Sequence, residues 1–451
     1  MDSLGKSLTF TFLFFTMDSL ATFSLGRKAM KKDKLKNKVG PWVDGDEFWN
    51  REEELESFRQ LLEQGENLLL VAPRRVGKTS LIRETLRRLR EKDERYGLFI
   101  DLQRSNKPED IIVELAKVTR EYAGLWNNTK DIFKSFLSEI VDRIDSIGIS
   151  DLELSFRQGV AGDWQSKGSR MFEELAKADK SVILFFDEFP VMVNRLLRGK
   201  DRQITNERIT ETDAFLSWLR QEMGKHQGRI SFVICGSIGL EPILNQAKLS
   251  NQIAHLRPFH LSPWSKETAD SCLKALAKNY ELDLDEAFRA AMLDKLGCYI
   301  PQHVQMFFGY IHDEISRDPD SDGGTVSISL VDKVYNNFML GSRGHAVLSD
   351  YEERLHRVLD RELVPLAIDL LTESAISGGM TRQTAMVLAQ SARLKTTDSR
   401  AALMTIMGVL EHDGFVQLNP KNEYVFVSKF VCDWWVKKFH SFYIPPTQRG
   451  I

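Results

Sequence analysis

The sequence predicts an α/β fold in which a parallel sheet is the middle of three layers, followed by a helical lid and a winged-helix domain. After residue 40, short apolar runs typical of strands buried on both faces alternate with amphipathic helical segments. One such run ends in a Gly-Lys-Thr turn that opens a helix, and another ends in two acidic residues. The last hundred residues instead show three helical segments followed by a hairpin.

Composition sets broad limits on function. The chain has 451 residues, with 61 Lys and Arg against 64 Asp and Glu and a net charge of −3. The length predicts two to four domains, and the charge excludes a surface that binds polyanions everywhere. The cysteines are far apart, so neither a CxxC metal site nor a disulfide framework is indicated, and we expect a cytoplasmic protein. They are Cys235, Cys272, Cys298 and Cys432.

Residues 1–40 are expected to be a leader, or a mis-assigned start, with a basic arm. The apolar run Leu8–Phe15 is too short to span a bilayer, which needs about 20 residues. Met-Asp-Ser-Leu occurs at residues 1 and 17, and Met30 opens the basic stretch MKKDKLKNK. Translation is therefore expected to begin at Met1, Met17 or Met30, and no membrane association is expected.

Residues 41–262 are predicted to form the α/β domain. Arg51–Gln64 is an amphipathic helix, and the strand Asn67–Ala72 leads through a turn into the helix Leu81–Lys92. Further strands are predicted at Leu98–Leu102, Val182–Phe186 and Ile230–Cys235.

The turn after the first strand carries the strongest chemical signal. Ala72 to Thr79 matches G-x-x-x-x-G-K-[ST] at Gly77, Lys78 and Thr79, with Ala72 in place of the first glycine. Main-chain N–H groups at a helix N-terminus bind phosphate, Lys78 would reach the β- and γ-phosphates, and the Thr79 hydroxyl would bind Mg²⁺. An accidental match is the alternative, but the flanking strand and helix are those that the motif requires. The predicted nucleotide-binding residues are Pro73, Arg74, Arg75, Val76, Gly77, Lys78, Thr79 and Ser80.

Two acids and a serine follow later strands. Asp187 and Glu188 end the run that starts at Ser181, which is typical of a Walker B element. We expect Asp187 to bind Mg²⁺ and Glu188 to polarise the attacking water; the alternative is that both acids cap the next helix. Ser237 follows the strand Ile230–Cys235 and is either a catalytic sensor of the γ-phosphate or a structural residue. Together these elements predict a P-loop NTPase fold of the ASCE type that uses ATP and Mg²⁺.

The motifs resemble those of the STAND branch of ATPases from bacteria and archaea, which are relatives of AAA+ initiators. The resemblance rests on FWNREEEL, APRRVGKTS, ILFFDEFP and FVICGS, and more loosely on LRPF, LGCYIP and Phe426–Trp435. It implies ATP hydrolysis, a sensor strand between the P-loop and Walker B strands, and Glu188 as the catalytic base. Asn251–Ala254 replaces the Gly-Arg common in the family, and the nearest arginine, Arg257, is expected to be a surface charge. Without an arginine finger, hydrolysis is expected to be slow.

Residues 263–340 are predicted to be the helical lid, and Leu340–Ser349 a linker. The winged helix is predicted over 350–451, with helices at Asp360–Ser374, Thr381–Ala392 and Asp398–His412 and a hairpin formed by Phe415–Leu418 and Tyr424–Val427.

Charge bears on what the winged helix binds. Residues 358–451 contain ten Lys and Arg against nine Asp and Glu, and the third helix has only Arg400 near its start. This balance favours an interaction or autoinhibitory module over DNA binding. The sequence therefore predicts an ATP-hydrolysing switch that acts on an unidentified protein partner or effector, or through nucleotide-dependent homo-oligomers. The alternative is a nucleotide-dependent DNA-binding regulator or loader.

Overall fold

The computed structural model describes residues 35–122, 162–317, 327–395 and 397–448. The predicted leader over residues 1–40 lies almost wholly outside these ranges, so it stays a prediction.

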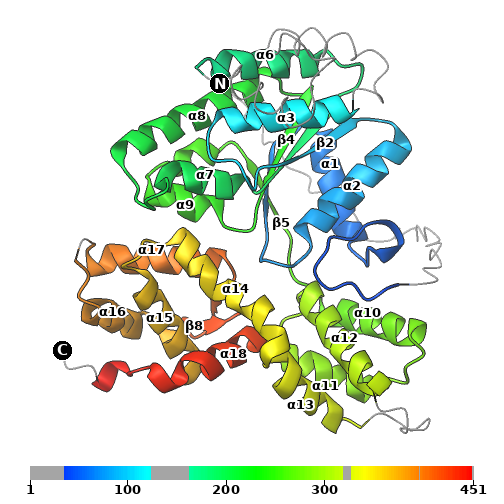
Figure 1. Ribbon diagram of the computed structural model, residues 1–451, viewed down its shortest axis with the longest axis vertical. Helices are drawn as coiled ribbons and strands as arrows, with labels where there is room; N and C mark the ends of the chain where they lie inside the picture. The colour runs from blue at the N-terminus through cyan, green and yellow to red at the C-terminus, as the bar shows by residue number, and fades with distance from the viewer. Residues whose placement is uncertain (1–34, 123–161, 318–326, 396, 449–451) are drawn as a thin grey trace, which may run out of the picture. The chain divides into compact units, whose positions relative to one another are not determined.

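A sheet of five parallel strands, in the order β2-β3-β4-β1-β5, forms the centre of the α/β region. Figure 1 shows the sheet between its flanking helices. Strand β4 lies between β1 and β3, which is the position that the family resemblance implied for the sensor strand. The four strands predicted for this region are present, and the structure adds β5. The bounds are β1 Leu68–Val71, β2 Tyr96–Asp101, β3 Val182–Asp187, β4 Ile230–Cys235 and β5 Arg257–His260.

The strand register brings the strand ends together. Leu70 is opposite Cys235 across β1 and β4, and Asp101 is opposite Asp187 across β2 and β3. Because the strands are parallel and in register, the loops that leave β1, β3 and β4 emerge at one edge of the sheet. Ligands bind at this edge in open α/β sheets.

Side chains of β3 alternate between two hydrophobic cores. Val182, Leu184 and Phe186 belong to one apolar cluster, and Ile183 and Phe185 belong to the other. Period-two alternation in a fully buried strand requires apolar layers on both faces of the sheet. The predicted three-layer arrangement is therefore confirmed.

Helices cover both faces of the sheet (Figure 1). On one face lie α1 (Glu52–Glu63) and α2 (Lys78–Lys92). The other face carries α3 (Glu109–Tyr122), α6 (Trp164–Ala176), α7 (Phe189–Arg198) and α8 (Asn206–Lys225), and α9 (Leu240–Gln246) follows β4.

The region after β5 is helical, as the sequence predicts for a lid. The Ser265 and Asp285 side chains cap α10 and α11 by accepting hydrogen bonds from main-chain N–H groups three residues later. The helices are α10 (Lys266–Asn279), α11 (Glu286–Leu296), α12 (Pro301–Arg317) and α13 (Ser329–Val334), and α13 runs on into a π-helical turn at Tyr335–Met339.

Most of the predicted linker Leu340–Ser349 is helical, because α14 spans Ser342–Val358; its role as a linker stays a prediction. Its two glycines suggested a break. However, a Cβ on Gly344 would lie 1.8 Å from the carbonyl oxygen of Met339, so this glycine permits close packing rather than flexibility. Leu348, Tyr351 and Leu355 then form the buried face of the helix.

The C-terminal residues form helices and a small antiparallel sheet in the predicted sequence order. The sheet has the strand order β6-β8-β7, and Trp434 and Trp435 of the last helix are buried. The elements are α15 (Val364–Ser377), β6 (Met380–Thr381), α16 (Arg382–Ser391), α17 (Ser399–His412), β7 (Val416–Leu418), β8 (Glu423–Phe426) and α18 (Lys429–Phe439).

None of the helices in the described ranges combines the length and apolar character needed to cross a membrane.

Candidate active site

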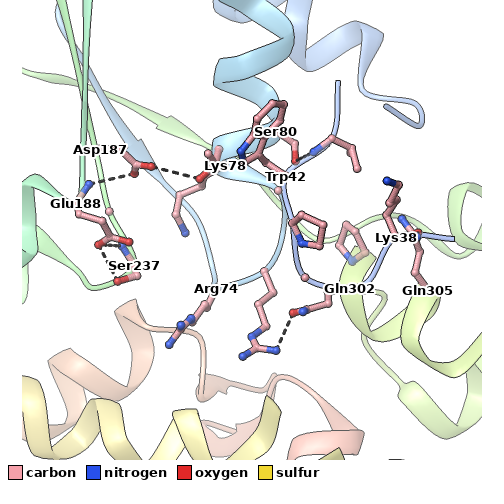
Figure 2. A pocket seen from close by; sticks show the side chains of 18 residues that line it. Lys38, Trp42, Arg74, Lys78, Ser80, Asp187, Glu188, Ser237, Gln302 and Gln305 are labelled. Atoms are coloured by element: carbon pink, nitrogen blue, oxygen red, sulfur yellow. Dashed lines mark hydrogen bonds between the residues drawn. The ribbon is translucent and has the colours of Figure 1, made fainter. Parts of the chain in front are cut away.

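A cavity of about 510 Å³ opens at the carboxyl edge of the sheet. This volume is within the range of small-molecule sites. It is lined by the turn after β1, by the residues that follow β3 and β4, by residues 38–43 and by the start of α12 (Figure 2). Six of the eight predicted nucleotide-binding residues line it: Arg74, Arg75, Gly77, Lys78, Thr79 and Ser80.

The other two predicted residues, Pro73 and Val76, do not line this cavity. The Val76 side chain is 1 % exposed and packs in the core beneath the turn, and its carbonyl oxygen accepts a hydrogen bond of 3.2 Å from Arg51 Nη2. Pro73 lies under Gly414, whose added Cβ would be 3.3 Å from the Pro73 ring. These two residues shape the turn instead of facing the cavity.

The turn is closed by a glycine and holds a buried cation. Gly77 has φ +104°, a conformation that L residues with side chains rarely adopt, and it directly precedes α2. Lys78 Nζ donates to the carbonyl oxygens of Ala72 (3.0 Å) and Pro73 (3.2 Å). Burial lowers the pKa of Lys78 to about 8. The two carbonyl oxygens thus stabilise the Lys78 ammonium group only partly, and an anion bound in the cavity would stabilise it further.

Asp187 lies at the end of β3 and faces the start of α2. Its Oδ2 accepts from the Thr79 hydroxyl at 3.4 Å, and its Oδ1 accepts from the Glu188 main-chain N–H at 3.0 Å and from the Cys235 thiol at 3.2 Å. Burial, and then the charge of Glu188, raise the pKa of Asp187. The two predicted metal ligands, Thr79 and Asp187, are thus adjacent oxygen donors.

Glu188 and Ser237, the two predicted catalytic residues, are in direct contact. The Ser237 main-chain N–H and hydroxyl both donate to Glu188 Oε2, at 3.0 and 2.8 Å (Figure 2). Gly236 permits this approach, because a Cβ there would lie 2.6 Å from Pro190 Cδ. Glu188 has a left-handed backbone with φ +57°, which turns its side chain out of the strand direction.

Comparison with known proteins identifies the family. The model of a family described as an ATPase domain predominantly from Archaea matches residues 48–291. The chain belongs to this family. It is an ATP-binding P-loop ATPase and therefore an ATP hydrolase.

Individual relatives are distant. The ATPase is 21 % identical over 305 residues to an ATP-binding protein of Methanocaldococcus jannaschii, covering 62 % of this chain and 77 % of the relative. A Walker-type ATPase of Pyrococcus abyssi has a TM-score of 0.56 at 17 % identity, with 88 % of this chain and 99 % of that chain covered. The ORC2 protein of Aeropyrum pernix, solved with ADPNP and ADP, has a TM-score of 0.48 at 13 % identity, covering 90 % and 97 %. The Pyrococcus abyssi structure shares the fold of this chain, and membership of the STAND branch stays a prediction.

Sequence reasoning missed the other end of the cavity of this ATPase. Lys38, Pro41 and Trp42 line it together with Gln302 and Gln305 of α12. The Lys38 main-chain N–H donates to Gln305 Oε1 at 2.7 Å, so the segment before α1 is held against α12. Trp42 is 49 % exposed. No motif marks these residues, because they converge only through tertiary packing.

The adjacent P-loop arginines contact different helices. Arg75 Nη1 donates to Gln302 Oε1 of α12 at 2.8 Å, whereas Arg74 is ion-paired with Asp350 of α14. Burial, and then the positive charges of Arg354 and Arg75, lower the pKa of Arg74 to about 10. The cavity thus carries an excess of cations, which suits a polyphosphate.

Arg257 does not line this cavity. It is half-exposed on β5 and pairs with Glu66 at 3.1 Å, consistent with the surface charge predicted for it.

Proposed function

We propose that this ATPase is a nucleotide-controlled switch, in which ATP binding and hydrolysis change the contacts among the P-loop, the helical lid and the C-terminal region. The observation that carries the proposal is the position of Arg74. This residue lines the cavity and is also ion-paired with Asp350 of α14. A phosphate group at the P-loop would compete with Asp350 for the same guanidinium group.

The phosphate chemistry is assigned to the residues that converge in the cavity. Main-chain N–H groups around Gly77 and the ammonium group of Lys78 would hold the β- and γ-phosphates. Thr79 and Asp187 would hold Mg²⁺, which supplies neutralisation of phosphate charge when bound. Among the described residues no group of three or more His, Cys, Asp and Glu could hold a metal, which fits an ion that takes its other ligands from phosphate and water.

Glu188 would orient the attacking water and accept its proton. Its Oε2 is engaged by the two donors of Ser237, whereas Oε1 accepts no hydrogen bond from the described part of the chain. Oε1 is therefore the oxygen assigned to the water. In this arrangement Ser237 acts by holding the carboxylate.

The C-terminal region is proposed to be a winged helix that serves as an interaction module. The third helix of a DNA-binding winged helix is the one that reads the major groove. Here this helix, α17, packs against α9 of the ATPase region. The exposed Met404 of α17 offers no charge to phosphate, and the charge of residues 358–451 is nearly balanced. These observations favour protein contacts over DNA.

Hydrogen exchange measured by mass spectrometry tests the switch, using full-length protein without nucleotide, with ADP and with a non-hydrolysable ATP analogue. We expect the ATP analogue to change exchange in α14, and we expect no change in the Lys78→Ala control. Unchanged exchange in α14 of nucleotide-saturated wild-type protein would contradict the switch.

Two further measurements address the remaining partner assignments. Light scattering in the same nucleotide states tests homo-oligomer formation. Fluorescence anisotropy with a labelled random duplex tests the DNA alternative, which nucleotide-dependent binding at moderate salt would support.

A further inference from the structure

Arg354 of α14 is a buried cation that joins two distant parts of the chain. Its side chain is 2 % exposed. Nη2 donates to the carbonyl oxygen of Ser237 at 2.7 Å and lies 3.0 Å from Oδ2 of Asp413. One guanidinium nitrogen thus binds both the loop after β4 and the residue that follows α17.

Asp413 holds the other end of the same loop. Its Oδ1 accepts a hydrogen bond of 3.2 Å from the Gly239 main-chain N–H. Burial alone would raise the pKa of Asp413, but the charge of Arg354, together with the neighbouring His412 side chain and the Gly239 N–H, brings it below its ordinary value. The loop from Ser237 to Gly239 is therefore held at its start by Arg354 and at its end by Asp413.

The approach of the C-terminal region to this loop is close. A Cβ on Gly239 would lie 2.3 Å from His412 Nδ1. Beside the direct contacts, the cavity that the loop, Arg354 and Asp413 line together has a volume of only about 20 Å³. A displacement of α14 or of the end of α17 would therefore move the loop.

Two features distinguish this ion pair from one that only stabilises the fold. Nε and Nη1 of Arg354 are buried without a hydrogen-bond partner among the described residues. A buried donor without a partner is unfavourable, so this arginine stabilises the fold less than a fully hydrogen-bonded one would. In addition, the loop that Arg354 holds is the one whose Ser237 donates twice to Glu188.

We propose that Arg354 is a positioning residue for ATP hydrolysis, which acts through the Ser237 loop on the Glu188 carboxylate and makes its position depend on Asp413 in the C-terminal region. The proposal rests on the proposed role of Glu188 in orienting water. Contacts run without a break from Glu188 through Ser237 and Arg354 to Asp413. A partner that moves Asp413 would therefore change the rate of hydrolysis through the Glu188 carboxylate.

The experiment measures ATP affinity and single-turnover hydrolysis of the full chain. Arg354→Met is compared with Arg354→Met/Asp413→Asn, because the double variant leaves no unpaired charge in the interior and keeps the test open if the single variant unfolds. We expect hydrolysis to fall at least ~10-fold in both variants. The ATP dissociation constant should stay within about threefold of wild type in the double variant, which keeps the local net charge, and should rise in Arg354→Met, because the Arg354 charge acts on Arg74 and Lys78.

Arg289→Met is the matched control. Arg289 is likewise a buried arginine, 8 % exposed, and it bridges Asp270 (2.7 Å) and the Leu284 carbonyl oxygen (2.7 Å) within the lid. This control should lose stability without a selective loss of hydrolysis. If the Arg354 variants hydrolyse ATP as fast as the control, the proposal is wrong.

A double-mutant cycle with Glu188→Gln locates the effect. If Arg354 acts through Glu188, adding Arg354→Met to Glu188→Gln should slow hydrolysis no further, whereas a second loss of the same factor would overturn the proposal. If Glu188→Gln alone hydrolyses ATP at the wild-type rate, the role of Glu188 itself is wrong. If Glu188→Gln is slow but the Arg354 variants hydrolyse ATP at the wild-type rate, only the role proposed for Arg354 is wrong.

Discussion

Replacing Lys78 with methionine should make the ligand-free protein more stable and abolish tight ATP binding. Lys78 is 9 % exposed, and two carbonyl oxygens are its hydrogen-bond acceptors. Burial lowers its pKa from 10.5 to about 8. Methionine keeps an unbranched apolar chain and removes the charge.

The magnitude follows from the shift in pKa. Each tenfold change in proton affinity corresponds to about 1.4 kcal/mol, so burial of the charged Lys78 disfavours the folded state by about 3 kcal/mol. The carbonyl groups of Ala72 and Pro73 lose their donor in the variant, which reduces the gain. We expect Lys78→Met to stabilise the ligand-free protein by about 1–3 kcal/mol.

The pH dependence has a definite sign. Between pH 8 and 10.5 the unfolded chain keeps a proton on Lys78 that the folded protein has lost, so the stability of the wild type rises with pH in this window. The variant lacks this rise.

Urea unfolding with and without nucleotide checks both the stability gain of Lys78→Met and its loss of ATP binding. ATP at ~100 times its dissociation constant stabilises the wild type by about 2.7 kcal/mol and should not stabilise Lys78→Met. The difference in unfolding free energy between Lys78→Met and the wild type should therefore shrink or change sign when ATP is added. A variant that is less stable than wild type without ligand, or that ATP stabilises equally, would refute the reasoning.

Four further outcomes are expected. Above about pH 8 the ATP affinity of the wild type should fall by up to ~10-fold per pH unit, because phosphate binds the protonated form of Lys78; titration calorimetry in matched buffers measures this dependence. Glu188→Gln should still bind ATP but hydrolyse it ~10²-fold more slowly, whereas Asp187→Asn should weaken Mg²⁺-dependent binding; hydrolysis and binding assays, with thermal unfolding as the control for folding, separate the two. Gly77→Ala should lower the free energy of unfolding by about 1–3 kcal/mol and weaken ATP binding, because alanine is strained at φ +104°; urea unfolding and ATP titration test the two effects. Trp435→Ala should destabilise the protein by about 3–5 kcal/mol in urea unfolding without changing ATP affinity, because this ring is fully buried and does not line the cavity.

The phosphate end of the site could be predicted because local pattern and sheet geometry determine it together. The strand β1, the glycine turn and the helix α2 follow one another closely in the sequence, so Lys78 opens the helix directly after Gly77. Asp187 and Ser237 follow strands that are parallel to the first, so one edge collects them despite their distance in sequence. The direct contact between Ser237 and Glu188 is consistent with the roles predicted for them.

The remaining residues carry no such local signal. Trp42 precedes every motif and reaches the cavity only because Val43 and Gly45 are hydrogen-bonded to side chains of α2. Arg354 lies on a helix that the sequence suggested would begin with a linker, and its partner Asp413 is 59 residues further along the chain. Pairing of this kind depends on how whole helices pack, which period and composition do not specify.

The pairing of Arg354 with Asp413 also has a consequence for how the protein is made. Every residue assigned to phosphate chemistry lies at or before Ser237, and Asp413 is 176 residues later. At a synthesis rate of ~5–20 residues per second, about 10–35 seconds pass between the two residues on the ribosome. Arg74 has no Asp350 partner until residue 350 is added, 113 residues after Ser237, and the loop after β4 lacks its Asp413 contact until the end of the interval. The nascent chain thus presents an open phosphate site before it is closed, so nucleotide can be present when the last contacts form.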